Sequence, residues 1–222
     1  MGARTAIARA RPLAGEQRRR TALLAMAQLE TSDLATALSK ILPLTADALE
    51  VTRASYWSLV ERDQSICCET LYEAATGTFT SGARLGSAQF PTYFAALRSS
   101  QAIDAADVAR DPRTLELVAY CAPLGIGAML DVPVWREGRL VGVLCHEQVG
   151  PPRRWSEEEQ AFATSSGKAI SIVLETAARS RAEERYRLVA QATGEVIWDW
   201  DLATDEVEWS RSFDTFGYPS AI

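Results

Sequence analysis

The stretch that most constrains the fold is residues 127–150, which read GAMLDVPVWREGRLVGVLCHEQVG. Apolar and β-branched residues recur at every second position on both sides of Glu137-Gly138, a pattern typical of a β-hairpin with strands at 128–135 and 140–149. On the first strand one face is wholly apolar, formed by Leu130, Val132 and Val134. The other face is mixed and holds Met129, Asp131, Pro133 and Trp135. Such a strand suits a sheet with a core on one side and a pocket or water on the other.

The register of this hairpin decides which face of the sheet His146 occupies. A two-residue turn at Glu137-Gly138 places His146 beside Met129, on the face of Asp131. A three-residue turn with Gly138 in a left-handed bulge shifts the pairing by one residue and moves His146 to the opposite face. The sequence is compatible with both registers, so both stay open.

The hairpin also carries a resemblance to a known family. A small residue, Leu, Val-Pro-Val, a Gly turn and then Leu-Val-Gly-Val-Leu are similar to the signature of GAF domains, which are sensory modules of bacterial signalling proteins. The run GVLCHEQVGPPRRWSEEEQAFA resembles GAF domains attached to sensor kinases and cyclic-di-GMP enzymes, and the resemblance covers residues 20–177. It implies an α+β fold: an antiparallel sheet of about six strands, helices on both faces and a long C-terminal signalling helix.

The resemblance also implies a ligand pocket. In the family, the region that corresponds to residues 75–125 packs over one sheet face and walls the pocket. Together with the strand phase, this geometry implies a ligand-binding set formed by Trp57, Tyr93, Tyr120, Met129, Asp131 and His146. Asp131 would accept hydrogen bonds from a small molecule, and the alternative is an ion pair with an arginine such as Arg84.

Two helices are expected before the first strand. Apolar residues at helical spacing predict an amphipathic helix over 16–30, after an Arg-rich lead-in segment at 1–19. Thr31 or Ser32 can cap a second helix, whose stripe is formed by Leu34, Leu38, Ile41, Leu42 and Leu49. Pro43 lies inside this stripe and is expected to kink or break the helix just before it.

The middle of the chain is expected to alternate between strands and short helices. Two strands are predicted at 52–60 and 65–72, and the turn-rich residues 74–87 are predicted to form a surface loop. A short helix is expected at 93–97, and another at 114–121 precedes the central hairpin.

A long helix is predicted after the hairpin. Ser156 and Glu159 have the spacing of a capping box, and the helix can run from Glu157 to about Val189. Residues 178–190 are polar on most faces, which is typical of a spacer or of a seam between two protomers. We favour the seam, because such helices resemble the connectors of dimeric sensors, and expect a homodimer through the terminal helices.

The last segment, 191–222, changes character and contains half of the tryptophans of the chain. Residues 196–201 and 206–209 flank a polar turn and read as a hairpin. This segment closely resembles the opening of a PAS domain, of which the chain holds only the first part. The chain is therefore expected to be a fragment of a longer protein, such as a sensor histidine kinase of a two-component system or a cyclic-di-GMP signalling protein.

The cysteines and the single histidine define the candidate chemistry. Zinc is disfavoured, because no C-x-x-C pair is present and His146 is the only histidine. Some GAF relatives attach bilins through a Cys-His dipeptide on a helix, but Cys145 and His146 lie on a strand and point to opposite faces. Haem would need only His146, yet a lone strand histidine is more often a core residue. No cofactor is therefore assigned, and reduced thiols in a cytoplasm are expected.

A thiol enzyme is a further alternative, since one GAF branch reduces free methionine sulfoxide. That chemistry needs a cysteine of low pKa and a resolving partner, and Cys67 or Cys68 with Cys121 are the candidates. The sequence places no electropositive residue beside them. No kinase histidine motif, ATP lid or GGDEF-type sequence is present, so we expect no enzymatic activity within this chain.

Composition narrows the partners. The formal net charge of −6 gives no basic footprint for nucleic acid. No apolar run approaches the roughly 20 residues that cross a bilayer, so no membrane partner is expected. We expect a sensory input module that binds a small molecule and relays a signal through a dimeric helix. The alternative is a ligand-free dimerisation and relay module whose pocket is filled by its own side chains.

Overall fold

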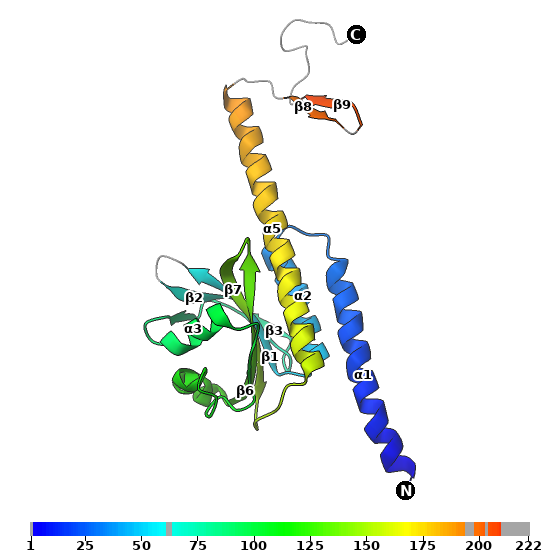
Figure 1. The fold of residues 1–222 in the computed structure, drawn as a ribbon, viewed down its shortest axis with the longest axis vertical. Helices are drawn as coiled ribbons and strands as arrows, with labels where there is room; N and C mark the ends of the chain where they lie inside the picture. Colours follow the sequence, from blue (N-terminus) through cyan, green and yellow to red (C-terminus); the bar gives the residue numbers. More distant parts are fainter. Residues whose placement is uncertain (1, 61–63, 194–197, 203, 210–222) are drawn as a thin grey trace, which may run out of the picture. The chain divides into compact units, whose positions relative to one another are not determined.

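The computed structural model describes residues 2–60, 64–193, 198–202 and 204–209. The chain divides into two compact units, Met1–Glu175 and Thr176–Ile222, and each is described by itself. The first unit is an antiparallel sheet covered by helices on both faces (Figure 1). This is the α+β architecture that the sequence predicted.

The sheet of the first unit has seven strands in the order β3-β2-β1-β7-β6-β5, and β4 also pairs with β2. Their bounds are β1 Arg53–Val60, β2 Ser65–Glu73, β3 Thr78–Thr80, β4 Arg84–Gly86, β5 Ile103–Ala105, β6 Ile126–Arg136 and β7 Arg139–Val149. The two long strands β6 and β7 are the predicted hairpin, and every pair of neighbouring strands is antiparallel.

The helices form two groups on the two faces of the sheet (Figure 1). One face carries α1 (Gly2–Ala27), α2 (Leu34–Leu49) and the first part of α5 (Glu157–Thr193). The other carries α3 (Pro91–Ser99), α4 (Val118–Cys121) and two short 3-10 helices, η1 (Leu115–Leu117) and η2 (Ala122–Leu124). We call residues 91–102 and 106–125, on either side of β5, the wall, and the two faces the helix side and the wall side.

Each face of the sheet has its own apolar core. The helix-side core includes Leu38, Ile41, Leu130, Leu144, Phe162 and Ile170. The wall-side core includes Trp57, Phe94, Leu97, Leu117, Met129 and Val143. The strict alternation of β6 produces this division, because Leu130, Val132 and Val134 point to the helices and Met129 points to the wall.

The start of α5 follows the predicted capping box. The Glu159 N–H donates to Ser156 Oγ at 3.2 Å, and the Ser156 N–H donates to Glu159 Oε2 at 2.9 Å. Gly167 lies where α5 crosses β6, and a Cβ atom there would lie 3.1 Å from Val132 Cγ1. The glycine therefore allows the close helix–sheet packing that offsets its low helix propensity.

The N-terminal helices differ from the expectation in three respects. Helix α1 begins at Gly2, so the predicted lead-in is helical, and it ends at Ala27. The N-cap of α2 is Asp33, whose Oδ2 accepts from the Thr36 N–H at 2.8 Å, and not Thr31 or Ser32. Helix α2 also continues through Pro43, because buried residues on both sides of it pack into one core, which offsets the single lost backbone bond.

Short elements in the middle of the chain were also missed. The predicted loop 74–87 contains β3 and β4, and β5 lies in a stretch that carried no strand prediction. The helix expected at 114–121 is split into η1 and α4, followed by η2. Strands of three residues cannot display a recurring alternation, so the pattern that found the long strands does not detect them.

The register of β6 and β7 combines features of both predicted alternatives. The turn has two residues, Glu137 and Gly138, with φ of 51° and 75°, as hairpin turns of this length require. Trp135 pairs with Leu140, but the next pair is Val134 with Gly142, so Val141 is an extra residue in a bulge. The bulge shifts all following pairs by one residue and sets His146 opposite Leu130 on the helix side.

The second unit contains the end of α5 and a short hairpin. Strand β8 (Trp198–Asp201) pairs antiparallel with β9 (Glu206–Trp209), and Trp198 lies opposite Trp209. A hairpin was predicted at this position. The rest of the segment that resembles a PAS opening, residues 210–222, lies outside the described residues.

Within the described ranges, none of the helices combines the length and the apolar character needed to cross a membrane.

Gly142 on β7 tests the packing of the sheet. A Cβ atom there would lie 2.5 Å from the Trp57 carbonyl oxygen and 2.5 Å from the Tyr56 hydroxyl, so Gly142→Ala forces strands apart. We expect the free energy of unfolding in urea to fall by about 3 kcal/mol. Gly86→Ala on β4 is the matched control, because its Cβ meets open space, and it should change the stability by less than about 0.5 kcal/mol. Equal losses in the two variants would contradict this packing.

Candidate functional site

A row of polar side chains crosses the wall side of the sheet. Pairing sets Asp131 of β6 opposite Cys145 of β7, and Cys145 opposite Ser55 of β1. All three residues are buried, beneath the wall. Because successive strand residues alternate between faces, these side chains point away from the apolar helix-side core. The row is thus a polar patch inside an otherwise apolar interior.

Tyr93 of α3 closes over Asp131. The Tyr93 hydroxyl donates to Asp131 Oδ2 at 2.7 Å, whereas Oδ1 is buried and has no hydrogen-bond partner among the described residues. Burial raises the pKa of Asp131 to about 7, and its interactions with the Tyr93 hydroxyl and the neighbouring Cys145 thiol oppose that rise. The carboxyl group is therefore balanced between its neutral and charged forms near neutral pH, with one oxygen available to a donor.

Glu147 adds a second buried carboxylate two residues along β7 from Cys145. Its Oε2 lies 3.3 Å from Arg53 Nε, an ion pair that does not meet hydrogen-bond geometry. Burial raises the pKa of Glu147, and the Arg53 charge lowers it. Arg53 is directly opposite Glu147 in the pairing of β1 and β7, so the strand register fixes this pair.

Aromatic and sulfur-containing side chains enclose the polar row. The rings of Trp57 and Tyr120 meet edge to face, with centroids 6.4 Å apart. Trp57 Nε1 donates to Ser55 Oγ at 2.9 Å, which links the ring to the row. Cys121 Sγ lies 3.9 Å from Met129 Sδ. The interior under the wall is thus lined by residues from β1, β6 and α4 that contact one another directly.

The thiols near this site are held in their protonated form. Burial raises the pKa of Cys68 and of Cys121 to about 12. Burial, and then the charge of Asp131, raise the pKa of Cys145 well above its usual value. A thiol nucleophile needs a substantial thiolate fraction near neutral pH. These environments suppress thiolate formation, so they favour packing over nucleophilic chemistry.

The structure brings five of the six predicted site residues together and separates one. The five that lie around the wall-side interior are Trp57, Tyr93, Tyr120, Met129 and Asp131. Asp131 is held by Tyr93, whereas Arg84 lies on β4, opposite Cys67. His146 is on the helix side, so it does not belong to this set.

His146 is a neutral, buried residue of the helix side. Its Nδ1 lies 3.0 Å from the Leu130 carbonyl oxygen, which can only accept, so Nδ1 carries the proton. Its Nε2 has no partner among the described residues, and burial lowers the pKa of the ring to about 4. Cys145 and His146 therefore point to opposite faces, and the pair does not fit a shared bilin or a haem in the wall-side interior.

Sequence reasoning missed Ser55, Cys145, Glu147 and Arg53 as parts of this interior. These residues come together only through the pairing of β1 with β7, which sets Ser55 opposite Cys145 and Arg53 opposite Glu147. The strand register would have been needed to find them. Within the described residues no group of three or more His, Cys, Asp or Glu side chains could hold a metal ion.

Comparison with known proteins identifies the fold family. The family model described as GAF domain matches residues 33–174, which is more than half of the chain. The chain belongs to the GAF family. No curated protein sequence matches this GAF domain significantly.

Solved structures support the same fold. The GAF domain of a phosphoenolpyruvate-protein phosphotransferase from Acinetobacter has 18% identity and a TM-score of 0.56, with 73% of this chain and 93% of that chain covered. A phycocyanobilin-bound GAF domain from a cyanobacterial phytochrome has 16% identity and a TM-score of 0.59, covering 73% and 94%. The free methionine-R-sulfoxide reductase of Neisseria meningitidis, solved with its substrate, has 12% identity and a TM-score of 0.57, covering 75% and 91%. At these identities the likeness establishes the fold alone.

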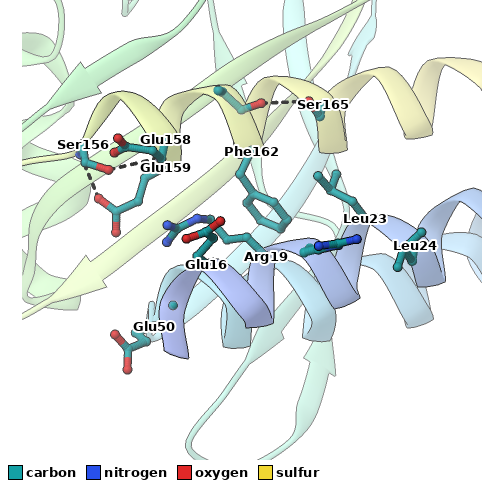
Figure 2. A pocket seen from close by; sticks show the side chains of 13 residues that line it. Glu16, Arg19, Leu23, Leu24, Glu50, Ser156, Glu158, Glu159, Phe162 and Ser165 are labelled. Atoms are coloured by element: carbon teal, nitrogen blue, oxygen red, sulfur yellow. Dashed lines mark hydrogen bonds between the residues drawn. The ribbon is translucent and has the colours of Figure 1, made fainter. Parts of the chain in front are cut away.

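A groove on the helix side of this GAF domain is a second surface feature. It has a volume of about 880 Å³ and lies between α1 and the first turns of α5. Figure 2 shows Phe162 of α5 reaching toward α1, with Leu23 beside it and Leu24 farther along α1. Arg19 borders the groove from α1, and Glu158 borders it from α5. The groove therefore combines an apolar floor with a basic and an acidic rim.

Two of the buried titratable groups, Asp131 and His146, predict opposite effects of pH on stability. The pKa of Asp131 is raised, so its contribution is fully present below pH 3.8 and is lost as the pH rises to about 7. The pKa of His146 is lowered, so its contribution is present above pH 6.5 and is lost as the pH falls to about 4. The Asp131→Asn variant lacks the pH-dependent contribution of Asp131 and keeps that of His146. We expect its stability relative to wild type to rise with pH between 4 and 7, by up to about 1.4 kcal/mol per unit.

His146→Gln is the matched variant for this experiment. It leaves the Asp131 effect, so its stability relative to wild type should fall as the pH rises from 4 to 6.5. Urea unfolding at a series of pH values measures both slopes. Parallel curves for wild type and both variants would mean that neither group is buried as described.

Proposed function

We propose that this GAF domain is the sensory input module of a bacterial signal-transduction protein. It binds a small molecule in the wall-side interior and passes the change to α5, and through it to a downstream output domain. The observation that carries the proposal is Asp131, which is buried, held by Tyr93 through one oxygen and without a hydrogen-bond partner for the other among the described residues. An unpartnered buried polar atom costs stability, and a molecule that donates a hydrogen bond to it would remove that cost.

The chemistry around Asp131 favours a ligand that donates hydrogen bonds. Oδ1 can accept from an amine, amide or hydroxyl group, and a ligand carrying positive charge would also lower the pKa of the carboxyl group. Trp57 and Tyr120 offer ring surfaces beside the polar row, which suit an apolar or planar remainder of the ligand. A small polar molecule with an apolar part fits both requirements.

Binding rather than catalysis is the activity that these side chains support. GAF domains are generally sensory, and a solved phytochrome GAF domain of the same fold binds phycocyanobilin. The likeness to a methionine sulfoxide reductase extends to the fold. A thiol enzyme would need a cysteine with appreciable thiolate, whereas burial raises the pKa of Cys68 and Cys121 to about 12.

A ligand-free relay module is the second candidate. Its supporting observation is the direct contact of Trp57 with Tyr120 and of Cys121 with Met129, which fills space that a ligand would occupy. In that case the wall would transmit strain or dimer contacts rather than ligand binding. The two candidates differ in whether the interior opens to a molecule.

We further propose that the module acts as a homodimer through its terminal helices. The groove between α1 and α5 has an apolar floor, and Leu24 and Ile172 are 57% and 63% exposed on these helices. Arg19 and Glu158 already attract each other across the groove within one chain, so a second copy would cover the apolar floor and the exposed side chains about a two-fold axis. The polar residues 178–190 would then continue the pair as a connector.

The output that we propose lies beyond α5. The β8–β9 hairpin supports a PAS domain beginning near residue 191, as in sensor histidine kinases or cyclic-di-GMP proteins. Four free cysteines are consistent with the reducing cytoplasm as its compartment.

Native mass spectrometry under native and then denaturing conditions tests ligand binding. We expect a discrete extra mass that is lost on denaturation. We expect Asp131→Asn to reduce the loaded fraction by about tenfold, since the amide oxygen stays with the Tyr93 hydroxyl and places an NH2 donor where Oδ1 accepted. Asp107→Asn, in an exposed turn of the wall, is the matched control and should keep the mass. A bare polypeptide mass in all three proteins, with no binding in a metabolite screen, would favour the relay module instead.

The dimer is tested by paired substitutions in the exposed helix faces. Leu24→Glu with Ile172→Glu places charge on both helices, and we expect the dimer to dissociate at least about a hundredfold more readily in sedimentation experiments. Leu115→Glu is the control, because Leu115 is equally apolar and 49% exposed but lies on the wall. A wild-type protein that stays monomeric at high micromolar concentration would contradict the dimer.

A further inference from the structure

Strand β5 lies at the edge of the sheet and presents Asp104 to a different face from its neighbours. Ile103 and Ala105 are buried in the wall-side core, opposite Asp131 and Met129 of β6. Asp104 pairs with Leu130, a residue of the helix-side core, so its side chain extends toward α5. The one acidic residue of this strand thus lies where the wall and the helix side meet, at the sheet edge.

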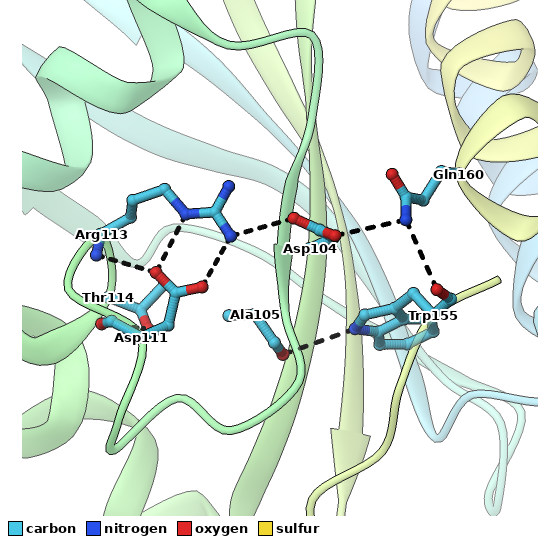
Figure 3. A network of polar contacts seen from close by, with 7 residues as sticks. All are labelled: Asp104, Ala105, Asp111, Arg113, Thr114, Trp155 and Gln160. Atoms are coloured by element: carbon cyan, nitrogen blue, oxygen red, sulfur yellow. Dashed lines mark hydrogen bonds and ion pairs between the residues drawn. The ribbon is translucent and has the colours of Figure 1, made fainter. Parts of the chain in front are cut away.

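Each oxygen of Asp104 holds a different part of the molecule (Figure 3). Oδ1 accepts from Arg113 Nη2 at 2.9 Å, and Arg113 belongs to the wall. Oδ2 accepts from Gln160 Nε2 at 3.2 Å, and Gln160 belongs to the first turns of α5. The carboxylate therefore bridges the wall and α5 around the edge of the sheet, rather than through either core.

Arg113 is rigidly held at the wall end of this bridge. Its Nε donates to Asp111 Oδ1 at 2.9 Å, and its Nη2 donates to Asp111 Oδ2 at 2.6 Å. The next residue, Thr114, is buried, and its hydroxyl donates to the Val108 carbonyl oxygen at 3.0 Å. A guanidinium fixed by a planar pair of bonds moves with its backbone. The Arg113 guanidinium therefore follows any movement of the loop that leads into η1.

The same loop leads directly to the ligand-facing residues. Within eight residues of Arg113 the chain reaches Tyr120, which contacts Trp57, and Cys121, which contacts Met129. A molecule that enters between the wall and the sheet would have to separate these contacts. The displacement would reach Arg113 through η1 and α4, two short helices that pack as one segment.

The α5 end of the bridge is also anchored to β5. Gln160 Nε2 donates to the Trp155 carbonyl oxygen at 3.4 Å, and Trp155 Nε1 donates to the Ala105 carbonyl oxygen at 3.4 Å (Figure 3). The Arg153 N–H donates to the Ala106 carbonyl oxygen at 2.9 Å, and the Arg153 guanidinium stacks on the Trp155 ring at 4.3 Å. The linker between β7 and α5 thus covers the open edge of β5.

We propose that Asp104 is the coupling residue between the wall-side site and α5. This inference rests on the proposed function for its biological role, and it specifies how that site is connected to the output helix. Arg113 and Asp104 remain 32% and 37% exposed, so their ion pair contributes little to stability and can break without unfolding the domain. A contact of this kind is suited to switching between two arrangements, one for each position of the wall.

Hydrogen exchange measured by mass spectrometry tests the coupling without any ligand. The variants are Arg113→Met at the wall end, Gln160→Met at the α5 end and Asp104→Ala in the centre. Coupling is reciprocal, so a change at either end must appear at the other. We expect Arg113→Met to raise exchange about threefold in 157–166, and Gln160→Met to raise it similarly in 114–121, as loss of one such contact allows. Asp104→Ala should raise exchange in both segments, 157–166 and 114–121.

Asp107→Ala is the matched control within the wall. Asp107 pairs with Arg110 and accepts from the Ala109 N–H in its own turn, so its loss should raise exchange only near residues 107–111. Thermal melts verify that every variant is folded. If Asp104→Ala does not fold, Asp104→Asn takes its place, because the amide removes the charge and keeps the shape of the side chain. Exchange that rises only around the substituted residue in all variants overturns the proposal. Because no ligand is used, this outcome is independent of whether ligand binding itself is found.

Discussion

One extra residue in β7, Val141, determines what each face of the sheet contains. The Glu137-Gly138 turn alone would set His146 on the face of Asp131, but the bulge shifts the pairing by one residue. Asp131 and Cys145 therefore meet under the wall, and Leu130 and His146 meet under the helices. The polar row, the neutral histidine and the separation of the two cores all depend on this shift.

The shift also places buried polar groups where they have distinct consequences. Under the wall, Asp131 keeps one oxygen without a partner among the described residues and a pKa of about 7, which suits the recognition of a donor group. Under the helices, His146 is neutral and bonded to the Leu130 carbonyl oxygen, so it belongs to the packing of that face. Asp104 joins the two faces at the sheet edge, where it contacts both the wall and α5.

Elements with long, regular patterns could be predicted from the sequence, and short or irregular ones could not. The alternation of residues 128–135 and 140–149 indicated the hairpin, and Ser156 with Glu159 indicated the start of α5. Strand β5 has three residues and no pattern of its own, because it forms only where β6 offers an edge. For the site, strand phase placed Met129 and Asp131 together. The bulge at Val141 had no local signal, since valine is ordinary in a strand, so the position of His146 required the tertiary register.

This register buries the Asp131 carboxyl group beneath Tyr93 on the wall side. Carbon-13 NMR of the side-chain carboxyl groups, with Asp131→Asn to assign the resonance, measures its pKa in the folded protein directly. We expect a titration midpoint near 7, far above the usual value of 3.8, because burial disfavours the charged form. A midpoint near 4 would mean that Asp131 is solvated or paired with a cation, and would contradict the closed, polar interior on which the proposed function depends.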